Sequence, residues 1–96
     1  MRKHGRTDSN HTEVVALFKR LGASVFSTAS LGDGFPDIAV GYRGLNHIIE
    51  IKDGEKPPSK RKLTEHEQKF HDNWEGECLI VESLDDVFEL MKLWKK

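Results

Sequence analysis

Two strands joined by a tight turn are encoded by residues 36–52, PDIAVGYRGLNHIIEIK. Arg43-Gly44 suits the two-residue loop of a β-hairpin. Counting outward from this turn places Asp37 directly opposite Glu50. Directly opposed residues on antiparallel strands have Cβ atoms about 4.5 to 5.5 Å apart. The stretch therefore predicts a hairpin that brings two carboxylates together at its open end.

The alternation of a strand divides the hairpin into two faces. One face is apolar and consists of Ile38, Val40, Ile49 and Ile51. The other face is mixed and consists of Asp37, Ala39, Ile48, Glu50 and Lys52. A face that changes from apolar to charged residues is expected where a sheet stops packing and a functional site begins.

The opposed carboxylates of Asp37 and Glu50 should repel each other, and a shared divalent cation is the simplest explanation for the pair. Mg²⁺ takes carboxylate, carbonyl and water oxygens, usually with only one or two protein carboxylates. The backbone carbonyl of Ile51 is a candidate third ligand. Lys52, on the same face, could orient or deprotonate a water, or stabilise transition-state charge. The constellation predicts metal-assisted phosphodiester hydrolysis; the alternative is a solvated Glu-x-Lys ion pair beside a turn-forming Pro-Asp.

The composition of the 96 residues is that of one soluble globular domain. No apolar run is long enough to span a bilayer, and the N-terminus lacks the apolar stretch of a signal peptide. We therefore expect a cytoplasmic protein of a prokaryotic or phage-infected cell. Cys78 is the single cysteine and the five histidines lack metal-ligand spacing, so any metal should be held by oxygen.

Positive charge is segregated although the net charge is only −1. One acid-free cluster opens the chain and contains Arg2, Lys3 and Arg6. A second cluster follows the hairpin and contains Lys56, Lys60, Arg61 and Lys62. Both could be solvated, mobile segments; their position relative to the carboxylates favours contact with nucleic-acid phosphates for the second cluster.

The remaining patterns predict an α/β fold in the order α-β-β-β-α-β-α, with a mixed sheet flanked by helices. The expected helices cover about residues 10–22, 64–74 and 84–95, and the expected strands cover 24–29, 36–42, 45–52 and 77–82, the last one buried. Capping-box spacing marks the helix starts Asn10 with Glu13, Thr64 with Glu67 and, more weakly, Ser83 with Asp86. The core stripe of the second helix would be Leu63, Phe70 and Trp74. We expect a single domain over 1–96, with its core at about 10–83 and a basic arm at 1–9.

Three motifs together resemble a known family: Gly34-Phe35-Pro36-Asp37, Glu50-Ile51-Lys52, and Leu63-Thr64 with Gln68. They are similar to the PD-(D/E)xK nuclease superfamily and, more narrowly, to its virus-type replication-repair nuclease (VRR-NUC) domain, over about residues 11–83. The resemblance implies a restriction-endonuclease-like core, dependence on Mg²⁺ with Mn²⁺ as a substitute, and cleavage of branched or otherwise structured DNA.

The resemblance also implies residue roles. Asp37 and Glu50 would be metal ligands and Lys52 the catalytic lysine. Glu13 would be the acid of the first helix that reaches the site directly or through water, although it could equally cap Asn10. Gln68 would support the site from the second helix, because it points away from the core stripe, toward either solvent or a cleft.

The last helix carries more apolar surface than a thin core readily hides, because Leu90, Leu93 and Trp94 widen its main stripe, Leu84, Val87, Phe88 and Met91. A two-fold dimer would bury this surface and present two active sites to two strands, as a four-way junction requires; the alternative is burial of both faces within the monomer. The expectation is thus a homodimeric, structure-selective DNA endonuclease, needing no membrane and no organic cofactor. A nonspecific nuclease of the same fold and a noncatalytic nucleic-acid-binding module are the alternatives.

Overall fold

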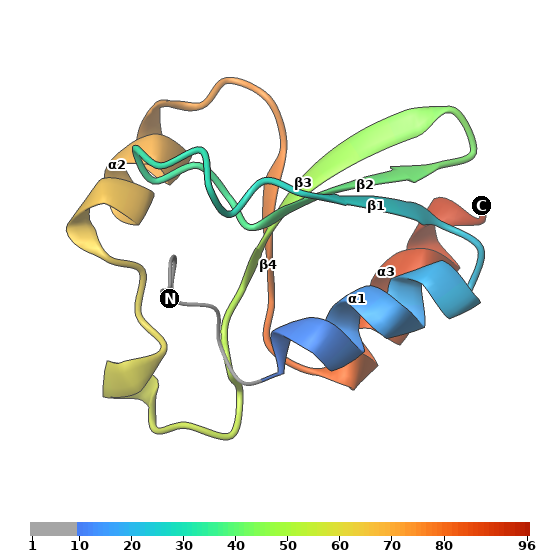
Figure 1. Cartoon of the computed structure of the whole chain (residues 1–96), viewed down its shortest axis with the longest axis horizontal. Coiled ribbons are helices and arrows are strands. Elements are labelled where there is room, and N and C mark those ends of the chain that lie inside the picture. The colour runs from blue at the N-terminus through green and yellow to red at the C-terminus, as the bar shows by residue number, and fades with distance from the viewer. Residues whose placement is uncertain (1–9) are drawn as a thin grey trace.

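The structure is a computed structural model that describes residues 10–96, so the predicted basic arm lies outside the described residues. Its elements follow the predicted order and are shown in Figure 1. They are α1 (His11–Arg20), β1 (Ser24–Ser27), β2 (Ile38–Tyr42), β3 (Leu45–Ile51), the 3₁₀ turn η1 (Pro58–Lys60), α2 (Glu65–Asn73), β4 (Cys78–Val81) and α3 (Leu84–Trp94). None of the helices in the described part of the chain is long and apolar enough to cross a membrane.

The four strands form one mixed sheet in the order β1-β2-β3-β4. The first three are antiparallel neighbours, whereas β4 runs parallel to β3. Helices α1 and α3 lie together against one face of the sheet, and α2 lies apart from them (Figure 1). The predicted α/β class and mixed sheet flanked by helices are confirmed.

The hairpin of β2 and β3 has the predicted turn and register. Arg43 and Gly44 both have positive φ, 53° and 84°, which is the requirement of a type I′ turn. Tyr42 pairs with Leu45, and the ladder continues to the pair Ile38 and Ile49. One further step along this register places Asp37 opposite Glu50.

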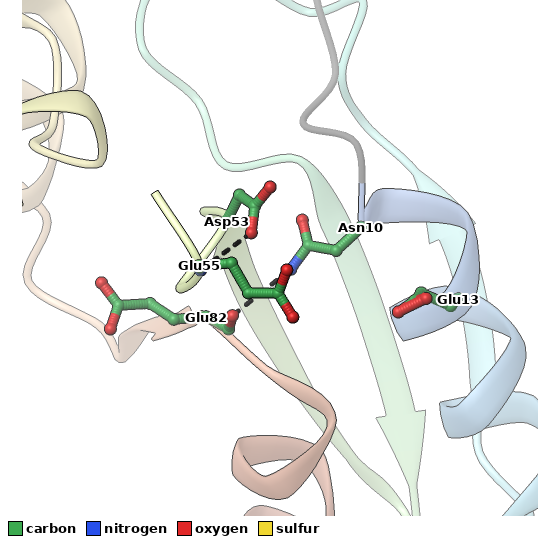
Figure 2. Close-up of a pocket in the computed structure, with 5 residues that line it drawn as sticks. All are labelled: Asn10, Glu13, Asp53, Glu55 and Glu82. Carbon is green, nitrogen blue, oxygen red and sulfur yellow. Dashed lines mark hydrogen bonds between the residues drawn. The ribbon is translucent and has the colours of Figure 1, made fainter. Parts of the chain in front are cut away.

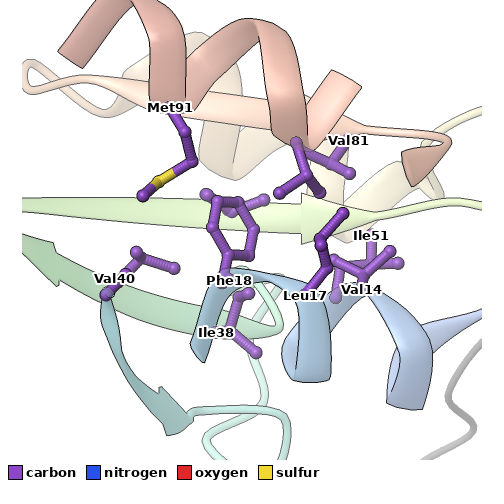
Figure 3. Packing of buried hydrophobic residues seen from close by; sticks show 11 residues of the cluster. Val14, Leu17, Phe18, Ile38, Val40, Ile51, Val81 and Met91 are labelled. Carbon is purple, nitrogen blue, oxygen red and sulfur yellow. The ribbon is translucent and has the colours of Figure 1, made fainter. Parts of the chain in front are cut away.

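The core lies between the sheet and the pair α1 and α3 (Figure 3). The apolar face of the hairpin is buried as predicted, with Ile38, Val40, Ile49 and Ile51 at most 1% exposed. Val14 and Phe18 of α1 and Val87 and Met91 of α3 pack against it. This core fixes which face of the hairpin remains for Asp37, Glu50 and Lys52.

Ile49→Val should lower the free energy of unfolding by about 0.5 to 1.5 kcal/mol, because it removes one methylene from the packed core. Ile80→Val is the matched control: Ile80 is 44% exposed, whereas Ile49 is fully buried. Its change should stay within about 0.5 kcal/mol. Urea unfolding of both variants measures the difference, and equal losses would contradict the register.

Two packing predictions are wrong in part. Strand β4 is an edge strand on which only Val81 is buried, so the predicted burial of the whole apolar run does not hold. No residue of α2 is buried. Two residues of the predicted core stripe, Phe70 of α2 and Trp74 directly after it, instead form an aromatic cluster with Phe35, and their rings lie 5.1 and 6.2 Å from the Phe35 ring. α2 is too far from the core for its apolar side to enter it.

Part of the apolar surface of α3 that was predicted to exceed what the core can cover is buried within the monomer. Leu90 and Trp94 pack against the core, and Trp94 stacks on the His47 ring at 3.8 Å. Their spacing from Val87 and Met91 places all four on one helical stripe. Phe88 (47%) and Leu93 (61%) are exposed instead.

Candidate active site

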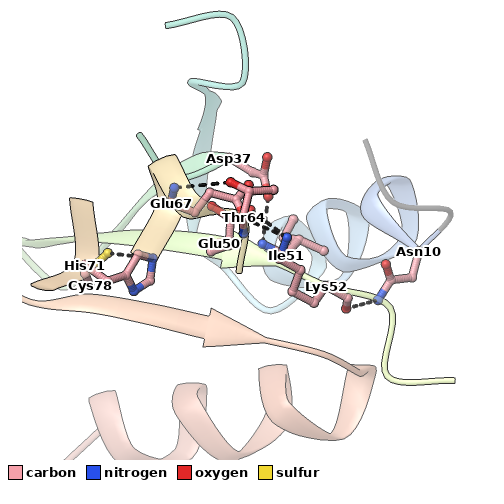
Figure 4. Close-up of polar contacts among 9 residues, drawn as sticks. All are labelled: Asn10, Asp37, Glu50, Ile51, Lys52, Thr64, Glu67, His71 and Cys78. Carbon is pink, nitrogen blue, oxygen red and sulfur yellow. Dashed lines mark hydrogen bonds and ion pairs between the residues drawn. The ribbon is translucent and has the colours of Figure 1, made fainter. Parts of the chain in front are cut away.

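Asp37 and Glu50 meet at the end of the hairpin, on the face turned away from α1 and α3 (Figure 4). The Asp37 carboxylate accepts a hydrogen bond from the backbone N–H of Ile51 (2.8 Å). The backbone carbonyl of Asp37 accepts another from the N–H of Thr28 (2.8 Å). These bonds hold Asp37 beside β3 although it lies just outside β2.

Glu50 is the most constrained acid of the site. It is only 2% exposed, and its Oε1 has no hydrogen-bond partner among the described residues. Burial, and then the negative charge of Asp37, raise the pKa of Glu50 to about 10. This buried carboxyl oxygen has no hydrogen-bond partner among the described residues and lies beside a second carboxylate. A positive charge nearby would stabilise it.

Lys52 supplies only part of that charge. It is 9% exposed, and its Nζ lies 3.8 Å from Glu50 Oε2 but 2.8 Å from Glu67 Oε1. Glu67 also accepts a hydrogen bond from the backbone N–H of Thr64 (2.9 Å). Burial tends to raise the pKa of Glu67, but the hydrogen bonds from Lys52 and Thr64 outweigh it and the pKa is lowered.

Glu67 is the site residue that sequence reasoning missed. The predicted capping box of Thr64 and Glu67 is present in the structure. Because capping already explained an acid at this position, no second role was expected for Glu67. Its contact with Lys52, fifteen residues earlier, depends on how α2 docks. The only signal in the sequence was an acid in the first turn of a helix that follows the Glu-x-Lys motif.

The loop before Asp37 determines how α2 docks. Gly34 has φ 79°, and a Cβ at this position would overlap the backbone carbonyl of His66 in the first turn of α2. Phe35 then packs against the aromatic side chains of the same helix. The segment Gly34-Phe35-Pro36-Asp37 thus links the position of the Asp37 carboxylate to the position of α2.

The structure places the two predicted helper residues away from these contacts. Gln68 is exposed and donates a hydrogen bond to Asp72 (2.8 Å). Glu13 is exposed and lines a pocket with Asn10, Asp53, Glu55 and Glu82 (Figure 2). The roles of Gln68 and Glu13 in catalysis stay predictions.

The predicted capping of α1 by Asn10 is wrong. Its side chain makes no capping hydrogen bond and instead donates to the backbone carbonyl of Lys52 (3.1 Å) and, more weakly, to that of Glu82 (3.4 Å). These long-range acceptors lie at the ends of β3 and β4, so Asn10 ties the start of α1 to the sheet.

The predicted cationic cluster lies in the segment that follows Lys52. Lys56, Lys60 and Lys62 are exposed. Arg61 has a structural role, because its guanidinium donates to the Lys56 carbonyl (2.9 Å) and to Glu82 (3.2 Å). Arg61 therefore contributes to holding this segment in place, whereas the side chains of the three lysines reach the surface.

The residues present fit a hard divalent cation. Within residues 10–96 no group of three or more His, Cys, Asp or Glu side chains is arranged to hold a metal ion, but Mg²⁺ commonly uses only one or two carboxylates. Asp37 and Glu50 provide two, and Glu50 Oε1 has no hydrogen-bond partner in the described part of the chain. The N–H of Ile51 points to Asp37, and the N–H and C=O of one strand residue point to the same side, so the Ile51 carbonyl points there too.

Cys78 does not extend the site chemically. Its Sγ lies 3.3 Å from His71 Nε2. Burial, and then the charge of Glu50, raise the pKa of the Cys78 thiol to about 11. A protonated thiol is a poor nucleophile and metal ligand, which agrees with the expectation that oxygen atoms would hold any metal.

A solved structure described as a VRR_NUC domain superimposes on this chain with a TM-score of 0.63. The match covers 85% of this chain and 89% of that one, at 24% sequence identity. This chain has the VRR_NUC fold. No family model and no curated protein sequence matches it. The resemblance found in the motifs is therefore confirmed at the level of the VRR_NUC fold.

Proposed function

We propose that this chain is a metal-dependent DNA endonuclease. The observation that carries the proposal is Glu50, a buried acid opposite Asp37 whose Oε1 has no hydrogen-bond partner within residues 10–96. A carboxyl group in this position is costly unless a cation or a proton neutralises it. The likeness to a VRR_NUC domain supports the proposal, because a divalent cation held by two carboxylates can assist phosphodiester hydrolysis.

Asp37, Glu50 and the carbonyl of Ile51 would hold Mg²⁺ or Mn²⁺. Such an ion would neutralise phosphate charge, orient the substrate and lower the pKa of a bound water. Lys52 Nζ lies at the edge of the same site, 3.8 Å from Glu50. Its ammonium group would hydrogen-bond a phosphate oxygen or the attacking water and stabilise charge that develops during cleavage.

The proposed substrate is branched DNA such as a four-way junction, in a repair-type reaction that leaves 5′-phosphate ends. Lys56, Lys60 and Lys62 would contact phosphates from the exposed segment after β3. Such contacts are insensitive to sequence and weaken as salt rises. Selectivity for branched DNA would come from two sites in a homodimer that cut two strands.

One cleavage assay tests the function. Wild type, Asp37→Asn, Lys52→Ala and the control Asp33→Asn are incubated with labelled four-way junction, flap, linear duplex and single-stranded DNA, in Mg²⁺, Mn²⁺ or EDTA. Asp33 is exposed and has φ 57°, a conformation that asparagine tolerates. Asp37→Asn and Lys52→Ala should each lose more than the roughly 10- to 100-fold typical when only a residue that supports a ligand is changed.

The outcomes separate the alternatives. Metal-dependent cleavage of the junction by wild type and Asp33→Asn alone supports the proposal. Equal cleavage of every DNA would indicate a nonspecific nuclease, and binding without cleavage would indicate a noncatalytic module. Undiminished activity of Asp37→Asn would contradict the assignment of the site.

The proposed homodimer would bury the exposed apolar residues of α3. Phe88→Glu should therefore shift the mass measured by light scattering from twice the 11.0 kDa of one chain to a single chain, because a buried unpaired charge at an interface is unfavourable. Leu45→Glu is the control, since Leu45 is also exposed (63%, against 47% for Phe88) but lies at the start of β3, next to the turn. A monomeric wild type would contradict the dimer and leave the site proposal intact.

A further inference from the structure

We infer that Glu67 is a positioning residue that holds the Lys52 ammonium beside the two carboxylates and makes the first turn of α2 part of the site. The inference rests on the proposed nuclease function, because it concerns how the catalytic lysine is oriented. Neither the motif nor the family resemblance assigns a role to Glu67.

The first argument is the geometry of the contact. The Lys52 side chain is 11% exposed, and its Nζ lies 2.8 Å from Glu67 Oε1, the length of a strong charge-assisted hydrogen bond. The distance from the same Nζ to Glu50 Oε2 is 3.8 Å. The ammonium group is therefore bonded to Glu67 and lies only near Glu50.

The second argument is that Glu67 is itself held in place. Its Oε1 accepts from the backbone N–H of Thr64 (2.9 Å), and its own N–H donates to the Thr64 hydroxyl (3.2 Å). The turn that carries it lies against Gly34, with no room for a Cβ between them. The Glu67 side chain is held by the capping box, and its helix turn is held against Gly34. Glu67 can therefore hold the Lys52 ammonium in one position.

The third argument concerns what Lys52 does without this partner. Among the described residues, the Glu50 carboxylate also lies within reach of Lys52 Nζ, at 3.8 Å, and an ammonium group that is mostly buried is stabilised by an acidic partner. With Glu67 neutral, Lys52 would be drawn onto Glu50, the carboxylate that we assign to the cation. Glu67 thus keeps the lysine available for phosphate and keeps Glu50 available as a ligand.

The cleavage test compares Glu67→Gln with Glu65→Gln. Glutamine also serves as the third helical residue of a capping box, so Glu67→Gln removes the charge and leaves the cap. Glu65 lies in the same turn but is exposed, so Glu65→Gln removes the same charge without affecting Lys52. With junction DNA and Mg²⁺, kcat of Glu67→Gln should fall about 10- to 100-fold, as is typical for residues that orient catalytic groups, with KM little changed. Glu65→Gln should match wild type in kcat and in Tm. Glu67→Gln should lower Tm, because it replaces the charge-assisted hydrogen bond of the mostly buried Lys52 ammonium with a neutral one, so kcat is compared below the Tm of that variant.

A second readout does not depend on cleavage. The ¹⁵Nζ signal of the Lys52 ammonium, observed by NMR, should show slowed hydrogen exchange in wild type and in Glu65→Gln, and this protection should be lost in Glu67→Gln. If wild type fails to cut any DNA, the proposed function fails while this signal still decides the role of Glu67. Wild-type kcat in Glu67→Gln, or an unchanged Lys52 signal, would overturn the inference.

Discussion

Glu50→Gln should raise the stability of the metal-free protein while it abolishes cleavage. At pH 8 the buried Glu50 carboxyl must either stay protonated or be ionised next to Asp37, and both states lower stability relative to a neutral amide. Glutamine needs no proton to stay neutral, so the variant avoids the cost of keeping Glu50 protonated above its unfolded pKa and should gain at least about 1 kcal/mol at pH 8. Cleavage should fall by more than about 100-fold, because a direct ligand is lost.

The stability gain should depend on pH in a defined direction. The pKa of Glu50 is raised from 4.5 to about 10 on folding. Between these values the folded state binds one more proton than the unfolded state, so the stability of wild type falls as pH rises. Below pH 4.5 both states are protonated and the effect vanishes. The advantage of Glu50→Gln over wild type should therefore grow between pH 5 and pH 9, by at most about 1.4 kcal/mol per pH unit.

Thermal melts in EDTA at several pH values measure this difference. Glu65→Gln is the control for loss of a glutamate charge, since Glu65 is exposed. A Glu50→Gln protein less stable than wild type at pH 8 would mean that Lys52 already compensates an ionised Glu50. The electrostatic account of the site would then be wrong.

Gly34→Ala should impair both folding and cleavage, because it separates α2 from the site. Gly34 has φ 79°, and a Cβ would overlap the backbone of His66, so the helix turn that carries Glu67 must move. We expect a loss of about 1 to 3 kcal/mol in stability and a fall in kcat at least as large as that of Glu67→Gln.

Gly32→Ala is the matched control for this prediction. Gly32 lies in the same loop and has nearly the same φ, 77°, but nothing lies within 4 Å of an added Cβ. Gly32→Ala therefore introduces the backbone strain of an alanine at positive φ without the overlap with α2. Melts and kcat measured below the Tm of both variants separate the two effects; equal behaviour would show that the contact between Gly34 and α2 is unimportant.

The hairpin and its carboxylates could be predicted from the sequence because they depend on local rules. Arg43-Gly44 sets the turn, the period of two sets the faces, and together they place Asp37 opposite Glu50. The observed register follows that count. The same alternation predicts that Lys52 lies on the same face as Glu50, because it is two residues further along the strand.

Glu67 and Asn10 could not be placed in this way, because their partners are distant in sequence. Each was explained by a capping pattern within its own helix. For Glu67 the cap exists and a second contact with Lys52 is added. For Asn10 the side chain bonds the ends of β3 and β4 instead of its own helix. Capping spacing identifies a helix start but does not exclude a tertiary role.

Mn²⁺-dependent thermal stability reports whether Asp37 and Glu50 together bind a divalent cation. A ligand that binds only the folded state raises Tm as its concentration increases. At pH 8 the account predicts that MnCl₂ raises the Tm of wild type and of Asp33→Asn but not of Asp37→Asn or Glu50→Gln. An equal rise in all four proteins, or no rise in wild type, would contradict it.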